Sequence, residues 1–171
     1  IVLDPTENCP AAQAGAKQIV GDFKDEDAIV KLAEQSDIIT YEIESGNTDV
    51  LSKVKAEIEP SPSTLGIIQD KLLQKTFLLE NELPISQFYK ITSLDDLRKK
   101  INELGLPVLL KSRRDAYDGR GNYKISSLEE IEKAYQYFDG KSLMVEKFVD
   151  FKMEVSVIAV RNTKGEIAVY P

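Results

Sequence analysis

The sequence predicts a mixed α/β chain with two unlike parts, and three observations support this fold class. Over residues 1–62, short apolar segments alternate with segments of helical periodicity, which is the order of a parallel α/β sheet. Over residues 84–148, a strand–helix–strand pattern occurs twice, which indicates an α+β domain. Between them, the prolines of 60–63 break both periodicities. We therefore expect one domain over 1–62 and a second over 63–171.

The first part carries four expected strands and two expected helices. The strands are expected at residues 1–4, 18–22, 37–44 and 57–62, and the helices at 25–36 and 48–56. Asp25 is the expected N-cap of the first helix. Ligands gather at the carboxyl ends of parallel strands, which makes Asp4 and Glu42–Glu44 candidate binding residues. The alternative is that these acidic side chains simply end strands in solvent.

The second part begins with one expected helix, from Ser63 to just before Pro84, with an apolar stripe at helical spacing. In the repeat over 84–148, each unit has a strand, a Ser-x-x-acid capping box, an amphipathic helix, a glycine stop and an apolar strand. The segments 154–162 ("EVSVIAVRN") and 166–171 ("EIAVYP") then alternate like an antiparallel hairpin that turns at "NTKG". Both ends of the chain read as strands that need partners, so we expect a window of a longer protein.

A glycine-rich, basic loop, within "LLKSRRDAYDGRGNYKI" (109–125), joins the two units of the repeat. Its central stretch, 113–121, is longer than a tight hairpin needs, and long loops in compact domains are usually functional. Residues 111–124 carry five Lys or Arg against two Asp, and Lys111 ends an apolar strand that can aim its ammonium group. Glycines let backbone N–H groups approach phosphate oxygens, so the loop is a candidate phosphate-covering flap. The alternative is a long hairpin turn whose charges keep it soluble.

A second candidate site follows "MVEKFV" (144–149), where a strand runs into a connector. Such a crossing can offer a backbone donor and acceptor to a purine ring, and a nearby carboxylate such as Glu154 can bind ribose hydroxyls. The pattern is weak by itself, because any strand end with two acids would match it. Isolated glutamates such as Glu146 and Glu154 are surface residues in most proteins.

The composition excludes several classes of function. The chain has no histidine, which removes Ser-His and Cys-His catalysis and imidazole metal ligands, and its one cysteine, Cys9, fits a reducing cytosol. The net charge is −7, and residues 63–171 hold 17 Lys or Arg against 16 Asp or Glu, so no basic domain suits a nucleic acid. No apolar run is long enough for a membrane span. We expect a cytoplasmic protein that binds a small anion.

Four stretches of the sequence carry a resemblance to a known family: "DIITYEIE", "IIQDKLLQKTFLLENELPISQF", "LGLPVLLKSRRDAYDGRGN" and "LMVEKFVDFKMEVSVIAVRNTKGEIAVYP". They resemble the ATP-grasp enzymes of purine biosynthesis that act as 5-(carboxyamino)imidazole ribonucleotide synthase, and the matching domain of eukaryotic phosphoribosylaminoimidazole carboxylase. The Tyr-Asp-Gly-Arg-Gly loop and "YEIE" are the specific parts, and the resemblance runs the whole chain. It implies a partial Rossmann-like (pre-ATP-grasp) parallel sheet over 1–62 and an α+β ATP-grasp domain over 63–171. Within the latter it implies a small subdomain at 84–148 and the start of a larger sheet at 149–171.

The resemblance also implies roles for particular residues. Lys71 and Lys111 would hold nucleotide phosphates, although Lys71 stands where many bacterial relatives have Arg. The connector would bind adenine, Glu154 would bind the ribose hydroxyls, and Glu42 would face the ribonucleotide substrate. The implied nucleotide-binding residues of the loop and the connector are Ala116, Tyr117, Asp118, Gly119, Arg120, Gly121, Asn122, Glu146, Lys147, Phe148 and Val149. The loop residues implied in substrate binding and catalysis are Tyr117, Asp118 and Arg120.

The implied reaction requires ATP and Mg²⁺. Bicarbonate attacks the γ-phosphate to give carboxyphosphate, which carboxylates the amine of 5-aminoimidazole ribonucleotide, and a closing flap would keep water from this labile intermediate. Acidic metal ligands are expected beyond Pro171, so no metal ligand is assigned within the chain, which is expected to be inactive alone. The resemblance implies a homodimer that acts on small molecules, without nucleic-acid or membrane partners.

Two alternatives to this reading remain open. The first is another ATP-grasp ligase, such as a formate-using transformylase or a biotin carboxylase. The second, for this chain by itself, is a nucleotide-binding module without turnover.

Overall fold

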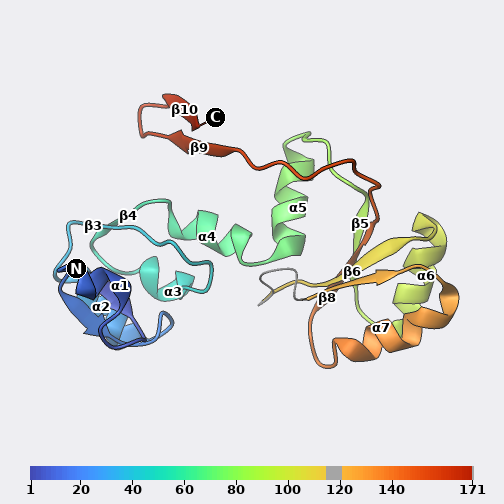
Figure 1. Ribbon diagram of the computed structural model, residues 1–171, viewed down its shortest axis with the longest axis horizontal. Helices are drawn as coiled ribbons and strands as arrows, with labels where there is room; N and C mark the ends of the chain where they lie inside the picture. Colours follow the sequence, from blue (N-terminus) through green and yellow to red (C-terminus); the bar gives the residue numbers. More distant parts are fainter. Residues whose placement is uncertain (115–120, 171) are drawn as a thin grey trace.

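The computed structural model of the chain describes residues 1–114 and 121–170. Five residues with predicted roles lie outside the described residues: Ala116, Tyr117, Asp118, Gly119 and Arg120. Figure 1 shows an N-terminal group of short elements, a second group around a four-stranded sheet, and a C-terminal hairpin that lies apart from that sheet. No helix within the described ranges is long and apolar enough to cross a membrane.

The N-terminal part contains parallel strands, as predicted, but they form two separate pairs. β1 (Val2–Asp4) pairs with β2 (Gln18–Val20), and β3 (Ile38–Ile39) pairs with β4 (Glu57–Ile58). The prediction of a strand over 37–44 was too long. Its partner β4 stops before Pro60, which has no N–H to donate, so β3 has few residues to pair with.

The helices of this part are short; they are α1 (Pro10–Gln13), α2 (Glu26–Ala33), which packs against β1 and β2, α3 (Thr48–Leu51) and α4 (Pro62–Ile68). Asp25 caps α2 as predicted, because its carboxylate accepts a hydrogen bond from the Ala28 N–H at 3.1 Å. The predicted helix over 48–56 was too long, since α3 ends at Leu51. Leu65 of α4 is buried in the core of the N-terminal part, beside Ile29 of α2.

Two helices occur where the sequence predicted one between Ser63 and Pro84. α4 ends at Ile68, and α5 (Lys71–Glu80) begins after Asp70. The Asp70 carboxylate accepts the Leu72 N–H at 3.0 Å, and its own backbone is extended, which caps a new helix. The single-helix prediction was therefore wrong, because apolar spacing alone does not show where a capping side chain restarts the helix.

Four strands form the second sheet, in the order β5–β8–β6–β7, and every neighbouring pair is antiparallel. The strands are β5 (Phe88–Ile91), β6 (Val108–Ser112), β7 (Asn122–Ile125) and β8 (Leu143–Lys147). The helical segments of the repeat are α6 (Leu94–Leu104), the 3₁₀ turn η1 (Leu128–Glu130) and α7 (Ile131–Tyr137). Both predicted units are present, but they interleave: β5 and β6 run parallel with β8 between them, and β7 and β8 run parallel with β6 between them.

The main core lies between this sheet and the helices α6 and α7. It includes Leu97, Ile101, Val108, Leu110, Ile125, Ala134 and Val145. Successive side chains of a strand point to opposite faces, so Lys111 of β6 and Glu146 of β8 lie on the face away from this core. That face carries the candidate site described below.

The C-terminal hairpin consists of β9 (Ile158–Arg161) and β10 (Ile167–Tyr170), which pair antiparallel as predicted. Gly165 in its turn has a φ of 85°, which favours glycine. Every residue of both strands is exposed, and Figure 1 shows the hairpin to one side of α5 and above α4 in this view, away from the four-stranded sheet.

Candidate functional site

A buried carboxylate, that of Glu146 on β8, organises the candidate site. The Lys111 Nζ on β6 lies 2.5 Å from Glu146 Oε1, and the Lys75 Nζ on α5 lies 2.6 Å from Glu146 Oε2. The Glu146 side chain is 9% exposed and the two lysine side chains are each 19% exposed. Three charges thus meet in a place that water reaches poorly, where each interacts strongly with the others.

The neighbours of Glu146 hold its carboxylate in place. Ser86 donates a hydrogen bond from Oγ to Glu146 Oε2 at 3.3 Å, and the Lys75 Nζ donates to Ser86 Oγ at 3.0 Å. Burial acts to raise the pKa of Glu146, but the hydrogen bonds and charges of Lys111 and Lys75 outweigh it, so the pKa lies below its usual value. Glu146 is therefore ionised at neutral pH.

Lys71 adds a third ammonium group to the site. It lies one helical turn before Lys75 on α5, which puts both side chains on one face of that helix. Burial and the nearby charge of Lys111 lower the pKa of Lys71, while Glu44 and Glu146 act in the opposite direction. We infer a cluster of three lysines around one carboxylate, which carries a net positive charge and suits a phosphate group.

The base of the glycine-rich loop is fixed by a buried ion pair. Arg113 contacts Asp70 in two places, with Nε 3.0 Å from Oδ1 and Nη2 2.5 Å from Oδ2. The Lys71 N–H also donates to the Arg113 carbonyl at 2.9 Å. A further hydrogen bond joins the two ends of the loop: the Ser112 N–H donates to the Gly121 carbonyl at 2.9 Å.

This anchoring changes the interpretation of the loop. The sequence predicts a loop that begins at residue 113, with Arg113 among its positive charges. Instead, the Arg113 side chain is only 17% exposed, since it is held against Asp70, which is 2% exposed. The two arginines therefore differ: Arg113 fastens the loop to α5, while Arg114, which is half-exposed, makes one longer contact of 3.4 Å with the same carboxylate.

The connector after β8 is partly engaged with the rest of the domain. The Lys147 N–H donates to the Gln87 carbonyl at 2.9 Å, and the Phe148 N–H donates to the Pro107 carbonyl at 3.3 Å. Val149 is exposed and Glu154 is exposed, outside any strand. Their predicted contacts with adenine and ribose stay predictions.

Gly121 and Asn122 are the described residues at the C-terminal end of the glycine-rich loop. Gly121 has a φ of 91°, a conformation that favours glycine, and Asn122 begins β7 opposite Lys111. The loop therefore leaves and re-enters the sheet beside the lysine cluster.

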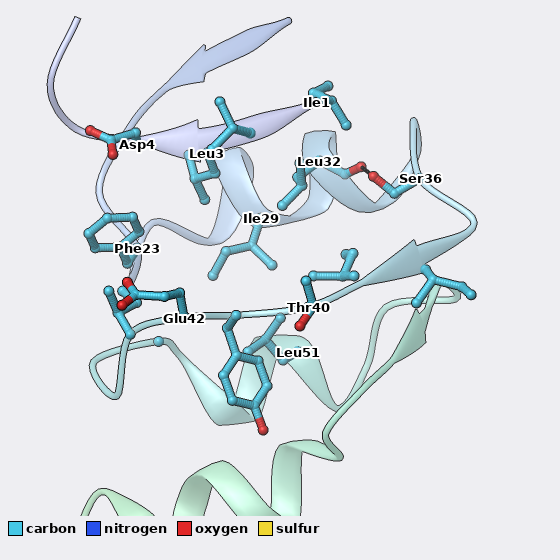
Figure 2. A pocket seen from close by; sticks show the side chains of 16 residues that line it. Ile1, Leu3, Asp4, Phe23, Ile29, Leu32, Ser36, Thr40, Glu42 and Leu51 are labelled. Carbon is cyan, nitrogen blue, oxygen red and sulfur yellow. Dashed lines mark hydrogen bonds between the residues drawn. The ribbon is translucent and has the colours of Figure 1, made fainter. Parts of the chain in front are cut away.

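A separate pocket of about 380 Å³ lies in the N-terminal part, between the strand pairs β1–β2 and β3–β4. Figure 2 shows Asp4, Phe23 and Glu42 gathered at one end of this pocket, with apolar side chains such as Ile29 and Leu51 along it. Asp4 ends β1 and Glu42 follows β3, so the structure brings the acids predicted at the carboxyl ends of the strands to one place. A volume of this size is in the range of small-molecule sites.

Metal ligands are not grouped within the described ranges. No cluster of three or more Asp, Glu, Cys or His side chains that could hold an ion occurs in residues 1–114 and 121–170.

Sequence reasoning missed three residues of this site: Lys75, Asp70 and Arg113. Lys75 could have been found from its place four residues after Lys71, which indicates a shared helix face. Asp70 could have been found as a capping residue before a helical segment. Its pairing with Arg113 joins residues 43 positions apart and leaves no local signal.

Two family models match the chain and together cover most of it. The ATP-grasp domain matches residues 76–171, and the ribonucleotide synthetase preATP-grasp domain matches residues 1–69. The first of these alone covers more than half of the 171 residues.

Curated relatives match the chain over its whole length. It is 42% identical to a phosphoribosylaminoimidazole carboxylase of Schizosaccharomyces pombe, over 100% of this chain and 32% of that protein. It is 36% identical to an N5-carboxyaminoimidazole ribonucleotide synthase of Brucella melitensis, over 99% of this chain and 48% of that protein. The chain thus spans about a third to a half of the length of these relatives.

Solved structures match both parts of the chain together. A carboxyaminoimidazole ribonucleotide synthase of Aspergillus clavatus, complexed with ATP, superposes with a TM-score of 0.93 at 36% identity, over 99% of this chain and 45% of that one. An Aspergillus clavatus N5-carboxyaminoimidazole synthase in complex with ADP and 5-aminoimidazole ribonucleotide gives a TM-score of 0.90 at 34% identity, over 99% of this chain and 45% of that one.

Proposed function

The chain belongs to the ATP-grasp family, and on this premise we propose that the full-length protein carboxylates 5-aminoimidazole ribonucleotide on its amine, using ATP and bicarbonate, in purine biosynthesis. The observation that carries the proposal is the cluster of Lys71, Lys75 and Lys111 around Glu146, at the point where the glycine-rich loop leaves β6. The cluster has the charge that a triphosphate requires, and rigid elements hold it. The likeness to structures complexed with ATP, and with ADP and the ribonucleotide, supports the choice of ligands.

In this proposal each part of the chain binds one part of the substrates. Lys111 and Lys71 neutralise the nucleotide phosphates, and the loop between Arg114 and Gly121 covers them. The backbone of the connector, 146–149, contacts adenine, and Glu154 accepts hydrogen bonds from the ribose hydroxyls. Because Lys147 N–H and Phe148 N–H already donate within the protein, adenine would meet the remaining backbone groups of the connector.

The N-terminal pocket is the proposed place of the ribonucleotide. Glu42 and Asp4 lie at one end of it, and Glu44, three positions before the turn into α3, influences Lys71 of the nucleotide site. This electrostatic link supports a position of Glu44 near the lysine cluster. A carboxyl group activated near the phosphates could then reach an amine held by the N-terminal part.

The chemistry that ATP supplies is an activated phosphoryl group for bicarbonate. The chain's own contribution is to neutralise charge as it builds up on the phosphates and to keep water away from the labile product of that first transfer. Since the described residues do not group acidic side chains for Mg²⁺, we derive no step through the metal. The homodimer and the cytoplasmic location stay predictions.

The proposal is tested by the dependence of ADP release on the two co-substrates. Purified full-length protein should release ADP rapidly only with both bicarbonate and 5-aminoimidazole ribonucleotide, and label from bicarbonate should appear in the ribonucleotide. ADP release with biotin, or with formate in place of bicarbonate, would contradict the proposal and favour another ligase of the family. For residues 1–171 alone we propose nucleotide binding without turnover, because the chain spans only about a third to a half of the length of its relatives.

A further inference from the structure

We propose that Lys75 is a positioning residue of the nucleotide site: it remains paired with Glu146 and so releases Lys111 to bind a phosphate. This inference rests on the proposed function, because it takes the lysine cluster to be the place where ATP phosphates bind. The inference gives a role to Lys75, which lies on α5 and belongs to neither the loop nor the connector.

The Glu146 carboxylate is divided between two lysines. Oε1 faces Lys111 at 2.5 Å, whereas Oε2 faces Lys75 at 2.6 Å and also accepts from Ser86 Oγ at 3.3 Å. The two ammonium groups therefore do not compete for one oxygen. Either lysine can leave while the other contact stays in place.

The two lysines differ in how firmly the protein holds them. Lys75 also donates to Ser86 Oγ at 3.0 Å, and its Nζ lies 5.8 Å from the centre of the Phe88 ring. Among the contacts of the described residues, Lys111 has Glu146 as its ion-pair partner, and it sits where β6 opens into the loop. Lys111 is thus the lysine that is placed to turn toward a ligand, and Lys75 is the one that stays.

The charge of Glu146 makes this division necessary. When Lys111 turns to a phosphate, a buried carboxylate that had lost its only partner would be strongly disfavoured and would repel the phosphate. With Lys75 in place, the carboxylate keeps a charged partner and the site keeps its net positive charge. Without Lys75, Glu146 would hold Lys111 more tightly and lower the positive potential that the phosphates meet.

The test is a double-mutant cycle in the full-length protein, with calorimetric titration of ATP and of adenosine, which has no phosphate. Lys75→Met should weaken ATP binding about tenfold, the loss of roughly one charged hydrogen bond, and should leave adenosine binding within about twofold. In the Glu146→Gln background, the same Lys75→Met change should weaken ATP by less than about threefold, because no carboxylate is left to neutralise. Lys75→Arg should retain ATP binding within about threefold.

A matched control is Lys133→Met on α7, whose side chain is exposed and distant in the fold from the β6–β8 site; it should leave both affinities unchanged. Equal ATP affinity in Lys75→Met and the unchanged protein would overturn the role of Lys75. So would an equal loss for adenosine and ATP, or the same loss in the Glu146→Gln background, since either would mark general damage to the fold. Failure of the unchanged protein to bind ATP would instead refute the nucleotide site, and the proposed function with it.

Discussion

The ion pair between Asp70 and Arg113 should be one of the largest single contributions to the stability of the protein. Asp70 is 2% exposed, contacts Arg113 through both carboxylate oxygens and caps α5 through the Leu72 N–H. Replacing it with alanine removes the helix cap and leaves a guanidinium without its partner in a place that is 17% exposed.

The magnitude follows from these two losses. Breaking one side of a buried ion pair costs about 3–5 kcal/mol, and losing an N-cap costs about 1 kcal/mol. Because the guanidinium retains some access to water, we take the lower end and expect Asp70→Ala to lower the free energy of unfolding by about 3 kcal/mol. Asp70→Asn keeps an oxygen for the cap and should cost less than Asp70→Ala.

Urea denaturation of the full-length protein measures this effect. At a slope of about 2 kcal/mol per molar, the expected loss lowers the midpoint by about 1.5 M for Asp70→Ala. The matched control is Asp95→Ala. The Asp95 side chain is 92% exposed and pairs with Arg98, so its removal should shift the midpoint by less than about 0.3 M. A shift for Asp70→Ala no larger than that of the control would refute the reasoning.

Three further predictions concern the acids of the site. Glu154→Ala should weaken ATP and GTP to the same extent if this carboxylate binds ribose, and selective loss of one nucleotide in competition titrations would contradict that role. Glu42→Gln should raise the KM for the ribonucleotide and spare the KM for ATP; the opposite pattern in steady-state kinetics would mean that the substrates occupy each other's proposed places. The pKa of Asp70 lies below its ordinary value, because hydrogen bonds and the charge of Arg113 outweigh the burial that would raise it. The stability difference between the unchanged protein and Asp70→Asn should therefore be full above about pH 5 and shrink as the pH falls below about 4, and a constant difference in urea midpoints down to pH 3 would contradict it.

The sequence predicted the ends of helices well where a single capping residue or glycine determines the end. Asp25 caps α2 through its own side chain, and Gly105 ends α6 with a φ of 70°. Ser127 forms the predicted capping box with Glu130. In each case the interaction lies within a few residues of sequence, so a pattern of residue types contains it.

The features that the sequence did not predict depend on contacts between distant residues. The interleaved strand order places β8 between β5 and β6, which follows from packing of the whole subdomain and not from either repeat. Asp70 meets Arg113 over a separation of 43 residues in the sequence, so the helix break and the fixed base of the loop were both missed. The sequence places Glu146 in the connector, whereas the side chain of Glu146 is buried between two lysines.

The central claim is that the lysine at the end of β6 binds nucleotide phosphate, and calorimetric titration of ATP into full-length Lys111→Ala tests it most directly. Loss of a charged hydrogen bond is worth about 1.5–3 kcal/mol, so ATP affinity should fall about ten- to hundredfold. The melting temperature should not fall, because Lys75 still neutralises Glu146. Unchanged ATP affinity, with the fold intact, would contradict the claim that this cluster is the phosphate site.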